Sequence, residues 1–196
     1  MTDHTFQPEA HNPSFVIAPM KRRHLKAVMR IERLVYPTPW SQTLFMSEMS
    51  LRTNRSYLVA QYGSIVVGYS GLMFADIDAH VTNIAVDPTW QQNQIATRLM
   101  LSHARLAIAN KAKHMTLEVR LSNRVAQRLY AKFGFAPAGI RKNYYQEENE
   151  DALIMWVNNI GSPEFAKRLA AIEAGIRGTT SIDIDPHRDQ PVETSQ

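Results

Sequence analysis

Hydrophobic residues recur along the chain with two different spacings, and these spacings predict an alternation of strands and helices. Short or alternating hydrophobic runs predict strands at residues 15–17, 57–61, 65–74, 79–86, 115–119, 140–145 and 152–156. Hydrophobic residues three or four positions apart predict helices at residues 21–35, 42–50, 95–110, 122–133 and 163–176. The order β-α-α-β-β-β-α-β-α-β-β, followed by one further helix, predicts an α/β fold in which helices flank a central mixed, mostly antiparallel sheet.

Two of the predicted helices are amphipathic, so the sequence also predicts which of their residues are buried. In the helix at residues 95–110, the residues expected to pack on the sheet are Ala96, Met100, Ala104, Ala107 and Ile108. The opposite face of that helix is expected to be exposed, with Arg98, Ser102 and Arg105. In the helix at residues 122–133, a hydrophobic stripe is expected from Val125, Leu129 and Phe133.

Proline, glycine and local composition divide the chain into one domain with additions at both ends. Residues 1–13 contain prolines and few hydrophobic residues, which predicts a disordered arm. Residues 14–160 form the predicted domain, and a glycine and a proline separate it from an extra helix within residues 161–178. Residues 179–196 are predicted to be a disordered tail.

The composition is that of an ordinary globular protein, with 44% of the 196 residues hydrophobic and 20% charged. The chain has no cysteine, which excludes disulfides and a thiol nucleophile. No hydrophobic run has the length of a signal-peptide core or of a membrane span, so we expect a cytoplasmic protein. Asp76 and Asp78 precede a predicted strand, but acids in a turn are usually turn formers, and we expect no metal.

The net charge of +4 is distributed unevenly along the chain. Residues 179–196 carry a net charge of −3, which leaves +7 on residues 1–178. A basic body suits an anionic cofactor or work near nucleic acid, although solubility alone also explains it. No basic run is interleaved with aromatic residues, so we expect no direct nucleic-acid binding.

Residues 83–96, Asn-Ile-Ala-Val-Asp-Pro-Thr-Trp-Gln-Gln-Asn-Gln-Ile-Ala, lead from a strand through a polar loop into a helix. Proline at position 88 ends the strand, because it cannot continue the hydrogen-bond ladder. The first turn of the following helix offers N–H groups without helical partners and the positive end of the helix dipole. This stretch therefore predicts a phosphate-binding site.

The same stretch resembles the acetyl-CoA-binding motif of the GNAT family of N-acetyltransferases, whose loop reads Arg/Gln-x-x-Gly-x-Gly/Ala. This chain keeps a small residue at Ala96 but has Gln94 where the family prefers glycine, which lets the backbone approach the pyrophosphate closely. The resemblance implies that the strand before the loop pairs with pantetheine and that the loop wraps the pyrophosphate. The residues implied in cofactor binding are Ile84, Ala85, Val86, Gln92, Asn93, Gln94, Ile95, Ala96, Thr97 and, from a later motif, Asn123.

A glutamate stands in the middle of the strand at residues 115–119, where glutamate is uncommon. Alternation places Met115, Leu117 and Val119 on one side of the strand and Thr116 and Glu118 on the other. Glu118 either faces solvent or is a base in a cleft, where burial would raise its pKa toward a useful range. The run Leu-Glu-Val-Arg-Leu-Ser-Asn at residues 117–123 resembles Leu-Glu-Val-Arg-x-Ser-Asn of RimI-type N-terminal acetyltransferases in the GNAT family, in which the glutamate is the base.

Asn123 and Tyr130 lie two helical turns apart and therefore share a face of the predicted helix. The run Leu-Tyr-Ala-Lys-Phe-Gly-Phe at residues 129–135 is similar to the family's Leu-Tyr-x-x-x-Gly-Phe. The resemblance implies that the asparagine bonds the pantetheine arm and that the tyrosine hydroxyl returns a proton to the leaving sulfur. Tyr130 could instead be a core aromatic residue with its hydroxyl satisfied locally.

Two further segments resemble the peptide-binding parts of the same enzymes. Pro39 and Trp40 lie in a proline-stiffened loop that would form one wall of a peptide pocket, or in which Trp40 is simply a hydrophobic plug. Tyr144 and Tyr145 lie at the base of an acidic hairpin loop, which could hold a protonated amine or be an ordinary charged tip.

Together these resemblances cover residues 15–157 and imply direct attack of an amine on acetyl-CoA, with Glu118 as base and Tyr130 as acid. A peptide α-amine has a pKa near ~8 against ~10.4 for lysine, so it is uncharged far more often at neutral pH. We therefore expect an Nα-acetyltransferase, and the resemblance implies the N-terminal alanine of a ribosomal protein as its substrate. The alternatives are a GNAT enzyme acting on lysine or a small amine, and a non-catalytic module that binds CoA or a partner.

Overall fold

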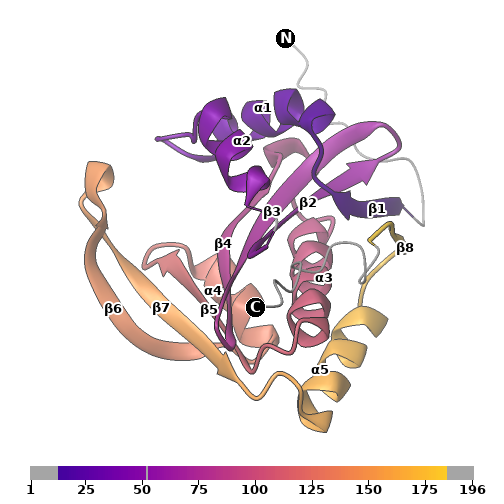
Figure 1. The fold of residues 1–196 in the computed structure, drawn as a ribbon, viewed down its shortest axis with the longest axis vertical. Helices are drawn as coiled ribbons and strands as arrows, with labels where there is room; N and C mark the ends of the chain where they lie inside the picture. The colour runs from indigo at the N-terminus through magenta and orange to yellow at the C-terminus, as the bar shows by residue number, and fades with distance from the viewer. Residues whose placement is uncertain (1–12, 52, 185–196) are drawn as a thin grey trace, which may run out of the picture. The chain divides into compact units, whose positions relative to one another are not determined.

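The computed structural model describes residues 13–51 and 53–184, and predictions for residues 1–12 and 185–196 lie outside this part of the chain. The elements are β1 (Ser14–Pro19), η1 (Arg22–His24), α1 (Leu25–Val35), α2 (Gln42–Ser50), β2 (Arg55–Tyr62), β3 (Ile65–Ala75), β4 (Asp78–Val86), η2 (Pro88–Trp90), α3 (Ile95–Ala109), β5 (His114–Arg120), α4 (Arg124–Lys132), β6 (Ala136–Tyr145), η3 (Gln146–Glu148), β7 (Glu150–Asn158), α5 (Pro163–Ala174) and β8 (Thr179–Ile182). The predicted order of strands and helices is confirmed, and Figure 1 shows the ribbon.

The chain divides into two compact units, which we describe separately. Among the described residues, the first unit contains residues 13–71, 83–102 and 176–184, and the second contains residues 72–82 and 103–175. The strands belong to one mixed sheet, with the order β3-β2-β1-β8 in the first unit and β6-β7-β5-β4 in the second. β1 is antiparallel to β2 and parallel to β8, whereas β5 is parallel to β4 and antiparallel to β7. The predicted α/β fold with a mixed sheet is therefore confirmed.

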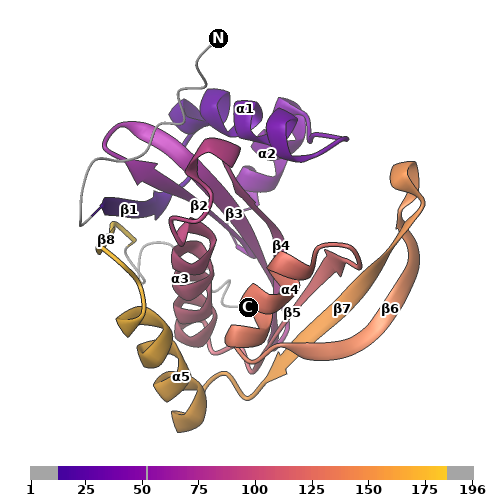
Figure 2. The same ribbon diagram turned by 180° about the vertical axis from the view of Figure 1, so that it is seen from behind.

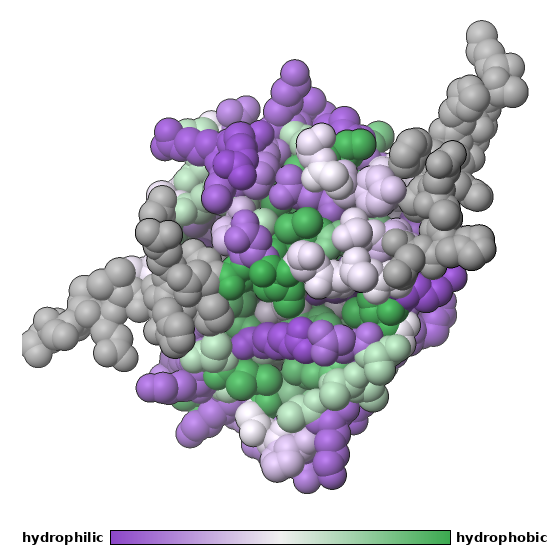
Figure 3. All heavy atoms as spheres, turned by 90° about the vertical axis from the view of Figure 1, so that its right-hand side faces the viewer, coloured by the Kyte–Doolittle hydropathy of each residue, from purple (hydrophilic) through white to green (hydrophobic). Residues whose placement is uncertain are grey.

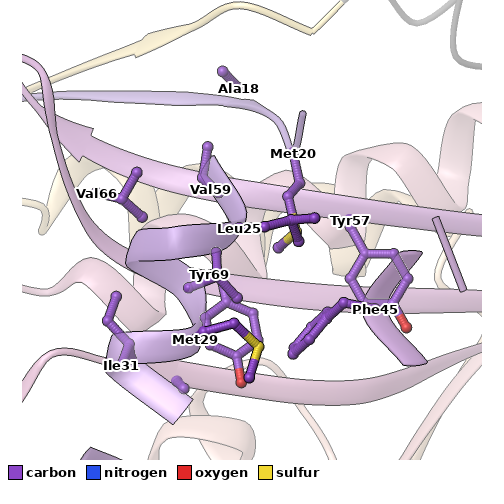
Figure 4. Packing of buried hydrophobic residues seen from close by; sticks show 12 residues of the cluster. Ala18, Met20, Leu25, Met29, Ile31, Phe45, Tyr57, Val59, Val66 and Tyr69 are labelled. Atoms are coloured by element: carbon purple, nitrogen blue, oxygen red, sulfur yellow. The ribbon is translucent and has the colours of Figure 1, made fainter. Parts of the chain in front are cut away.

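The core of the first unit lies between its first two helices and its strands. Phe45 of α2 is fully buried and packs edge-on against Tyr69 of β3, with ring centroids 5.6 Å apart. Figure 4 shows side chains of α1, such as Met29 and Ile31, directed toward side chains of the strands, such as Val59. Burial of each such large apolar side chain contributes roughly 1.5–3 kcal/mol, and this packing fixes α1 and α2 on one side of the strands.

Gly68 of β3 allows the start of α3 to approach the sheet closely. A Cβ atom at this position would lie 2.9 Å from Cγ2 of Ile95 and 3.0 Å from the carbonyl oxygen of Ala85. Any side chain at Gly68 would therefore push the first turn of α3 away from the strands. Gly68 thus lets the first turn of α3 lie close to the end of β4.

The predicted disorder after Gly178 is wrong for residues 179–182, which form β8. β8 pairs in parallel with β1, with Thr179 opposite Ser14 and Ile182 opposite Ile17. The backbone N–H of Asp183 also donates to the carbonyl oxygen of Ile17 at 2.8 Å. Threonine and isoleucine are β-branched and suit a strand, but the acidic residues that follow them obscured this signal in the sequence.

The second unit consists of the end of β3, the start of β4, the rest of α3, the strands β5, β7 and β6, and the helices α4 and α5. Figure 2 shows the ribbon from behind. Met115, Leu117 and Val119 of β5 are buried, which confirms the predicted alternation. β6 begins at Ala136 rather than at the predicted Ile140, and Pro137 is tolerated because β6 is the last strand in the order.

The extra helix α5 packs beside the end of α4, which the sequence could not indicate. Phe165 and Leu169 of α5 are buried, and Nη1 of Arg168 donates to the carbonyl oxygen of Lys132 at 3.3 Å. Gly134 ends α4 with a φ of +89°, and a Cβ atom there would lie 3.1 Å from Nε of Arg168. The predicted stop at Gly134 is thus confirmed, and the glycine also makes room for α5.

Figure 3 shows hydrophobic side chains exposed between hydrophilic ones on the face that it draws. In the described part of the chain, no helix is long and apolar enough to cross a membrane.

Candidate active site

The end of β4 is held by contacts within the first unit. The hydroxyl of Tyr36 donates to the carbonyl oxygen of Ile84 at 3.2 Å, and the N–H of Asp87 donates to the carbonyl oxygen of Val67 at 2.9 Å. Although burial acts to raise the pKa of Asp87, hydrogen bonds from Thr89 and the charge of Arg30 hold it below its usual range. Asp87 is therefore a charged cap that fixes the start of the following loop.

Residues 91–94, which we call the glutamine loop, connect η2 to α3 and are strongly bent. Gln92 and Gln94 both have positive φ angles, 65° and 58°, in the left-handed region that costs a non-glycine residue roughly 1–2 kcal/mol. The side-chain amide of Asn93 donates to the carbonyl oxygens of Trp90 and Gln91, both at 3.1 Å. The bend therefore takes place through glutamines and is supported by local hydrogen bonds.

The side chain of Gln94 is bonded to the C-terminal segment of the chain. Its Oε1 accepts a hydrogen bond from the backbone N–H of Arg177 at 2.8 Å. The N–H of Arg98 donates to the carbonyl oxygen of Gln94 at 3.0 Å and closes the first helical turn. The N–H groups of Ile95, Ala96 and Thr97 thus have no acceptor within α3, and the positive end of the helix dipole lies there.

This arrangement fits a phosphate-bearing cofactor. A left-handed bend followed by a helix N-terminus directs backbone N–H groups toward one region, as anion-binding loops do. The guanidinium of Arg177 adds positive charge, since its Nη2 donates to the carbonyl oxygen of Gln92 at 3.5 Å. The geometry of the loop is therefore compatible with a bound phosphate group, even though Gln94 stands at the position of the expected glycine.

In the second unit, Glu118 lies between two basic side chains. Its Oε2 is 3.1 Å from Nε2 of His80, and its Oε1 is 3.1 Å from Nη1 of Arg141. The hydrogen bond from His80 lowers the pKa of Glu118, burial opposes this, and the charges of His80 and Arg141 lower it further. The expected rise of the Glu118 pKa by burial is therefore wrong, because the basic neighbours outweigh the loss of solvent.

The neighbours of Glu118 change what this site can do chemically. Nε2 of His80 donates to one carboxylate oxygen and Arg141 faces the other, so both neighbours orient the carboxylate and stabilise its ionised form. An ionised carboxylate at this position can accept a proton. Sequence reasoning missed His80, because no local pattern gives the parallel pairing of β4 with β5 that brings it near Glu118.

Tyr130 and Asn123 lie at opposite ends of α4. Tyr130 is buried, with its ring centroid 6.1 Å from that of Phe135, and burial raises the pKa of its hydroxyl. The hydroxyl therefore stays protonated at neutral pH and can donate a proton. Asn123 is the N-cap of α4, since its Oδ1 accepts from the N–H of Ala126 at 3.0 Å, and its amide NH₂ keeps donors that could reach a ligand.

The hydrophobic stripe predicted on α4 is only partly present. Phe133 is fully buried, but Val125 is 72% exposed. Val125 lies in the first turn of α4, just after the capping residue Asn123.

The two tyrosines of the last hairpin pack against arginines. The guanidinium of Arg120 lies 3.8 Å from the ring centroid of Tyr145, and that of Arg141 lies 5.2 Å from the ring centroid of Tyr144. Burial raises the pKa of Tyr145 to about 12. Arg120 also pairs with Glu148 and Glu150, at 3.1 and 3.2 Å. These two acids of the hairpin loop are thus engaged within the protein.

Trp40 is half-buried in the first unit and packs against Phe45, with ring centroids 5.2 Å apart, while Pro39 is exposed. This contact is the one that the hydrophobic plug interpretation predicts for Trp40.

The predicted site residues fall into two groups by unit. The first unit holds Pro39, Trp40, Ile84–Val86 and residues 92–97, and the second holds Glu118, Asn123, Tyr130, Tyr144 and Tyr145. Within the described residues, no three histidine, aspartate or glutamate side chains are grouped as metal ligands.

Comparisons with known proteins agree with this arrangement. The sequence model of the acetyltransferase (GNAT) family matches residues 25–135, more than half of the chain. A Bacillus subtilis (strain 168) protein with the provisional name ribosomal protein bS18-alanine N-acetyltransferase is 39% identical over 138 residues, which cover 70% of this chain and 91% of that protein. The Escherichia coli (strain K12) ribosomal protein bS18-alanine N-acetyltransferase is 33% identical over 142 residues, covering 71% of this chain and 94% of that protein.

Solved structures have the same fold. The crystal structure of the ribosomal-protein-S18-alanine N-acetyltransferase from Escherichia coli matches with a TM-score of 0.68 and 28% identity. The match covers 74% of this chain and 94% of the E. coli chain.

Proposed function

Because the chain belongs to the acetyltransferase (GNAT) family, we propose that it acetylates the N-terminal α-amine of a ribosomal protein that begins with alanine. The chain is an acetyl-CoA-dependent N-acetyltransferase, and acetyl-CoA supplies the thioester whose acetyl group is transferred. The names of the relatives support the N-terminal alanine of a ribosomal protein as the substrate. This chain matches those relatives over about nine-tenths of their length. A ribosomal substrate would place the enzyme in the cytoplasm, as we expect from the sequence.

The observation that carries the catalytic part of the proposal is the position of Glu118 between His80 and Arg141. A carboxylate that these neighbours keep ionised can accept a proton from an attacking amine, directly or through water. Tyr130, whose hydroxyl stays protonated, would donate a proton to the departing thiolate. In this scheme the amine attacks the thioester directly, and the protein contributes positioning and proton transfer.

The remaining residues would bind the two substrates. The backbone of Ile84–Val86 would pair with the pantetheine arm as an added strand does, and residues 92–97 would hold the pyrophosphate, with Asn123 reaching the pantetheine. Pro39, Trp40, Tyr144 and Tyr145 would contact the first residues of the peptide. Arg141, which lies over the ring of Tyr144 and beside Glu118, would link the peptide contacts to the base.

Selectivity for an α-amine follows from acid strength. At neutral pH the α-amine, with a pKa near ~8, is uncharged far more often than a lysine amine near ~10.4. A single carboxylate with a lowered pKa is a weak base and removes a proton from a charged amine poorly. It therefore suits the α-amine, which is uncharged more often than a lysine amine at neutral pH. Lysine or a small amine as substrate is the alternative, and so is a CoA-binding module without catalysis.

The test is acetyl transfer from acetyl-CoA to a peptide with an N-terminal alanine and one internal lysine, located by mass spectrometry. The matched control peptide has the same sequence with its α-amine already acetylated. Label on the α-amine and none on the control peptide would support the proposal. Label on the lysine would move the substrate to the alternative class, and tight CoA binding without transfer to peptides or to ribosomal proteins would favour the binding module.

A further inference from the structure

The C-terminal segment, residues 176–180, contacts the glutamine loop through backbone and side chain. The N–H of Arg177 donates to Oε1 of Gln94 at 2.8 Å, and its guanidinium donates to the carbonyl oxygen of Gln92 at 3.5 Å. These are the two residues of the loop that have left-handed backbone angles. The C-terminal segment therefore contacts the loop at both strained positions.

The C-terminal segment is itself held firmly, so that it can hold the loop in turn. Arg98 of α3 is only 1% exposed, and its guanidinium donates to the carbonyl oxygen of Arg177, to the hydroxyl of Thr180, and to the carbonyl oxygen of Thr179 at 3.2 Å. At Gly178 the φ angle is +80°, and a Cβ atom there would lie 2.1 Å from the carbonyl oxygen of Pro13. The position of Arg177 is thus fixed from both sides of the turn.

A glutamine in the left-handed region needs such support. Without a partner, a residue that has a Cβ atom prefers right-handed or extended angles, whereas glycine adopts left-handed angles at no steric cost. The hydrogen bond from Arg177 supplies a local interaction that only the observed loop conformation allows. In that conformation the loop and the first turn of α3 present their N–H groups together.

We propose that Gln94 is a positioning residue for acetyl-CoA: through its hydrogen bond with the N–H of Arg177, the C-terminal segment holds the glutamine loop in the conformation that receives the pyrophosphate. This inference rests on the proposed function, because it takes the loop to be the pyrophosphate site. It gives residues outside the family match, which ends at residue 135, a role in cofactor binding.

The test compares Gln94→Ala with Gln94→Gly, because both variants lose the side-chain acceptor but only alanine keeps the steric cost of the bend. Isothermal titration measures the affinity of each full-length protein for CoA and for pantetheine, which lacks phosphate. We expect Gln94→Ala to bind CoA about 5- to 30-fold more weakly than the wild type. Gln94→Gly should stay within about 3-fold of the wild type, and pantetheine affinity should be the same in all three proteins.

A structural readout accompanies the affinities. In both variants the amide hydrogen of Arg177 should exchange with solvent faster than in the wild type, since its acceptor is gone. Unchanged CoA affinity in Gln94→Ala, an equal loss in both variants, or an equal loss for pantetheine would each overturn the inference while leaving the proposed function intact. A wild-type protein that does not bind CoA would overturn both.

Discussion

Replacing Glu118 by glutamine tests the proposed base with little change in shape. Glutamine keeps an oxygen that can accept the hydrogen bond from His80, now 3.1 Å from the carboxylate, but it cannot accept a proton at neutral pH. Loss of a general base costs a rate factor on the order of 10² to 10⁴. We therefore expect kcat for acetylation of an alanine-starting peptide to fall by roughly that factor, with the affinity for CoA unchanged.

The same substitution should leave the protein folded. Arg141 would lose its carboxylate partner, but its side chain is half-exposed and water can solvate it. Loss of this ion pair should therefore lower the free energy of unfolding by ~1 kcal/mol or less. The hydrogen bond from His80 then goes to a neutral amide oxygen instead of a carboxylate, which costs roughly 1 kcal/mol more. Urea unfolding should show a loss of stability on the order of 1–2 kcal/mol.

Glu32 provides a control, because it is a buried glutamate of the first unit and has no part in the proposed chemistry. The hydroxyl of Tyr69 donates to its Oε1, and glutamine at position 32 can accept the same bond. Glu32→Gln should therefore keep acetylation within about 3-fold of the wild type. An activity of Glu118→Gln within 10-fold of the wild type would refute the assignment of the base, as would equal losses in the two variants.

The pH dependence follows from the lowered pKa of Glu118. A carboxyl whose folded-state pKa is below its unfolded value stabilises the protein above the unfolded pKa, and this contribution is lost as the pH falls through the folded pKa. The stability difference between the wild type and Glu118→Gln should thus be constant near neutral pH and shrink below about pH 4.5. The logarithm of kcat/KM should rise with pH with a slope of one up to the α-amine pKa near ~8. A second ionisation between pH 5 and 7 that is present in the wild type and absent in Glu118→Gln would contradict this account.

Three further substitutions have definite expected outcomes. Tyr130→Phe removes the proposed proton donor and should lower kcat about 10²-fold, with CoA affinity measured by titration within 3-fold of the wild type. Arg98→Met removes the buried guanidinium that donates to two carbonyl groups of the C-terminal segment and should lower the free energy of unfolding in urea by about 2–4 kcal/mol; a loss below 1 kcal/mol would show that water replaces the guanidinium. Ser162→Ala removes the N-cap bond to Phe165 and should cost about 1 kcal/mol in the same assay without changing activity, which calibrates the other losses.

The sequence predicted well those features that depend on neighbouring residues. The alternation in β5 placed Glu118 opposite the buried face, because a strand in a half-covered sheet shows its burial in every second residue. The stop of α4 at Gly134 was also correct, because a left-handed C-terminal residue is a local requirement. Strand β6 was predicted four residues too short, since proline indicated a break that a terminal strand tolerates.

Features that depend on distant segments could not be predicted. Arg98 and Ser102 have the spacing of an exposed helix face, yet both are buried, and Arg98 bonds a segment about eighty residues later in the chain. Burial also lowers the pKa of Arg98, because a charged guanidinium is less stable away from solvent. The partners of Glu118 were missed for the same reason, because His80 and Arg141 reach it from other strands whose register no single segment encodes.

Glu32 and Glu118 differ in their surroundings, and this difference supports the proposed base. Burial raises the pKa of Glu32, which lies in the hydrophobic core and accepts a hydrogen bond from the hydroxyl of Tyr69. The pKa of Glu118 is lowered because basic side chains face both of its oxygens, so it is ionised when the substrate amine begins to lose its proton. An ionised carboxylate can accept the proton of an attacking amine. The surroundings of the two residues therefore favour Glu118 over Glu32 as the proposed base.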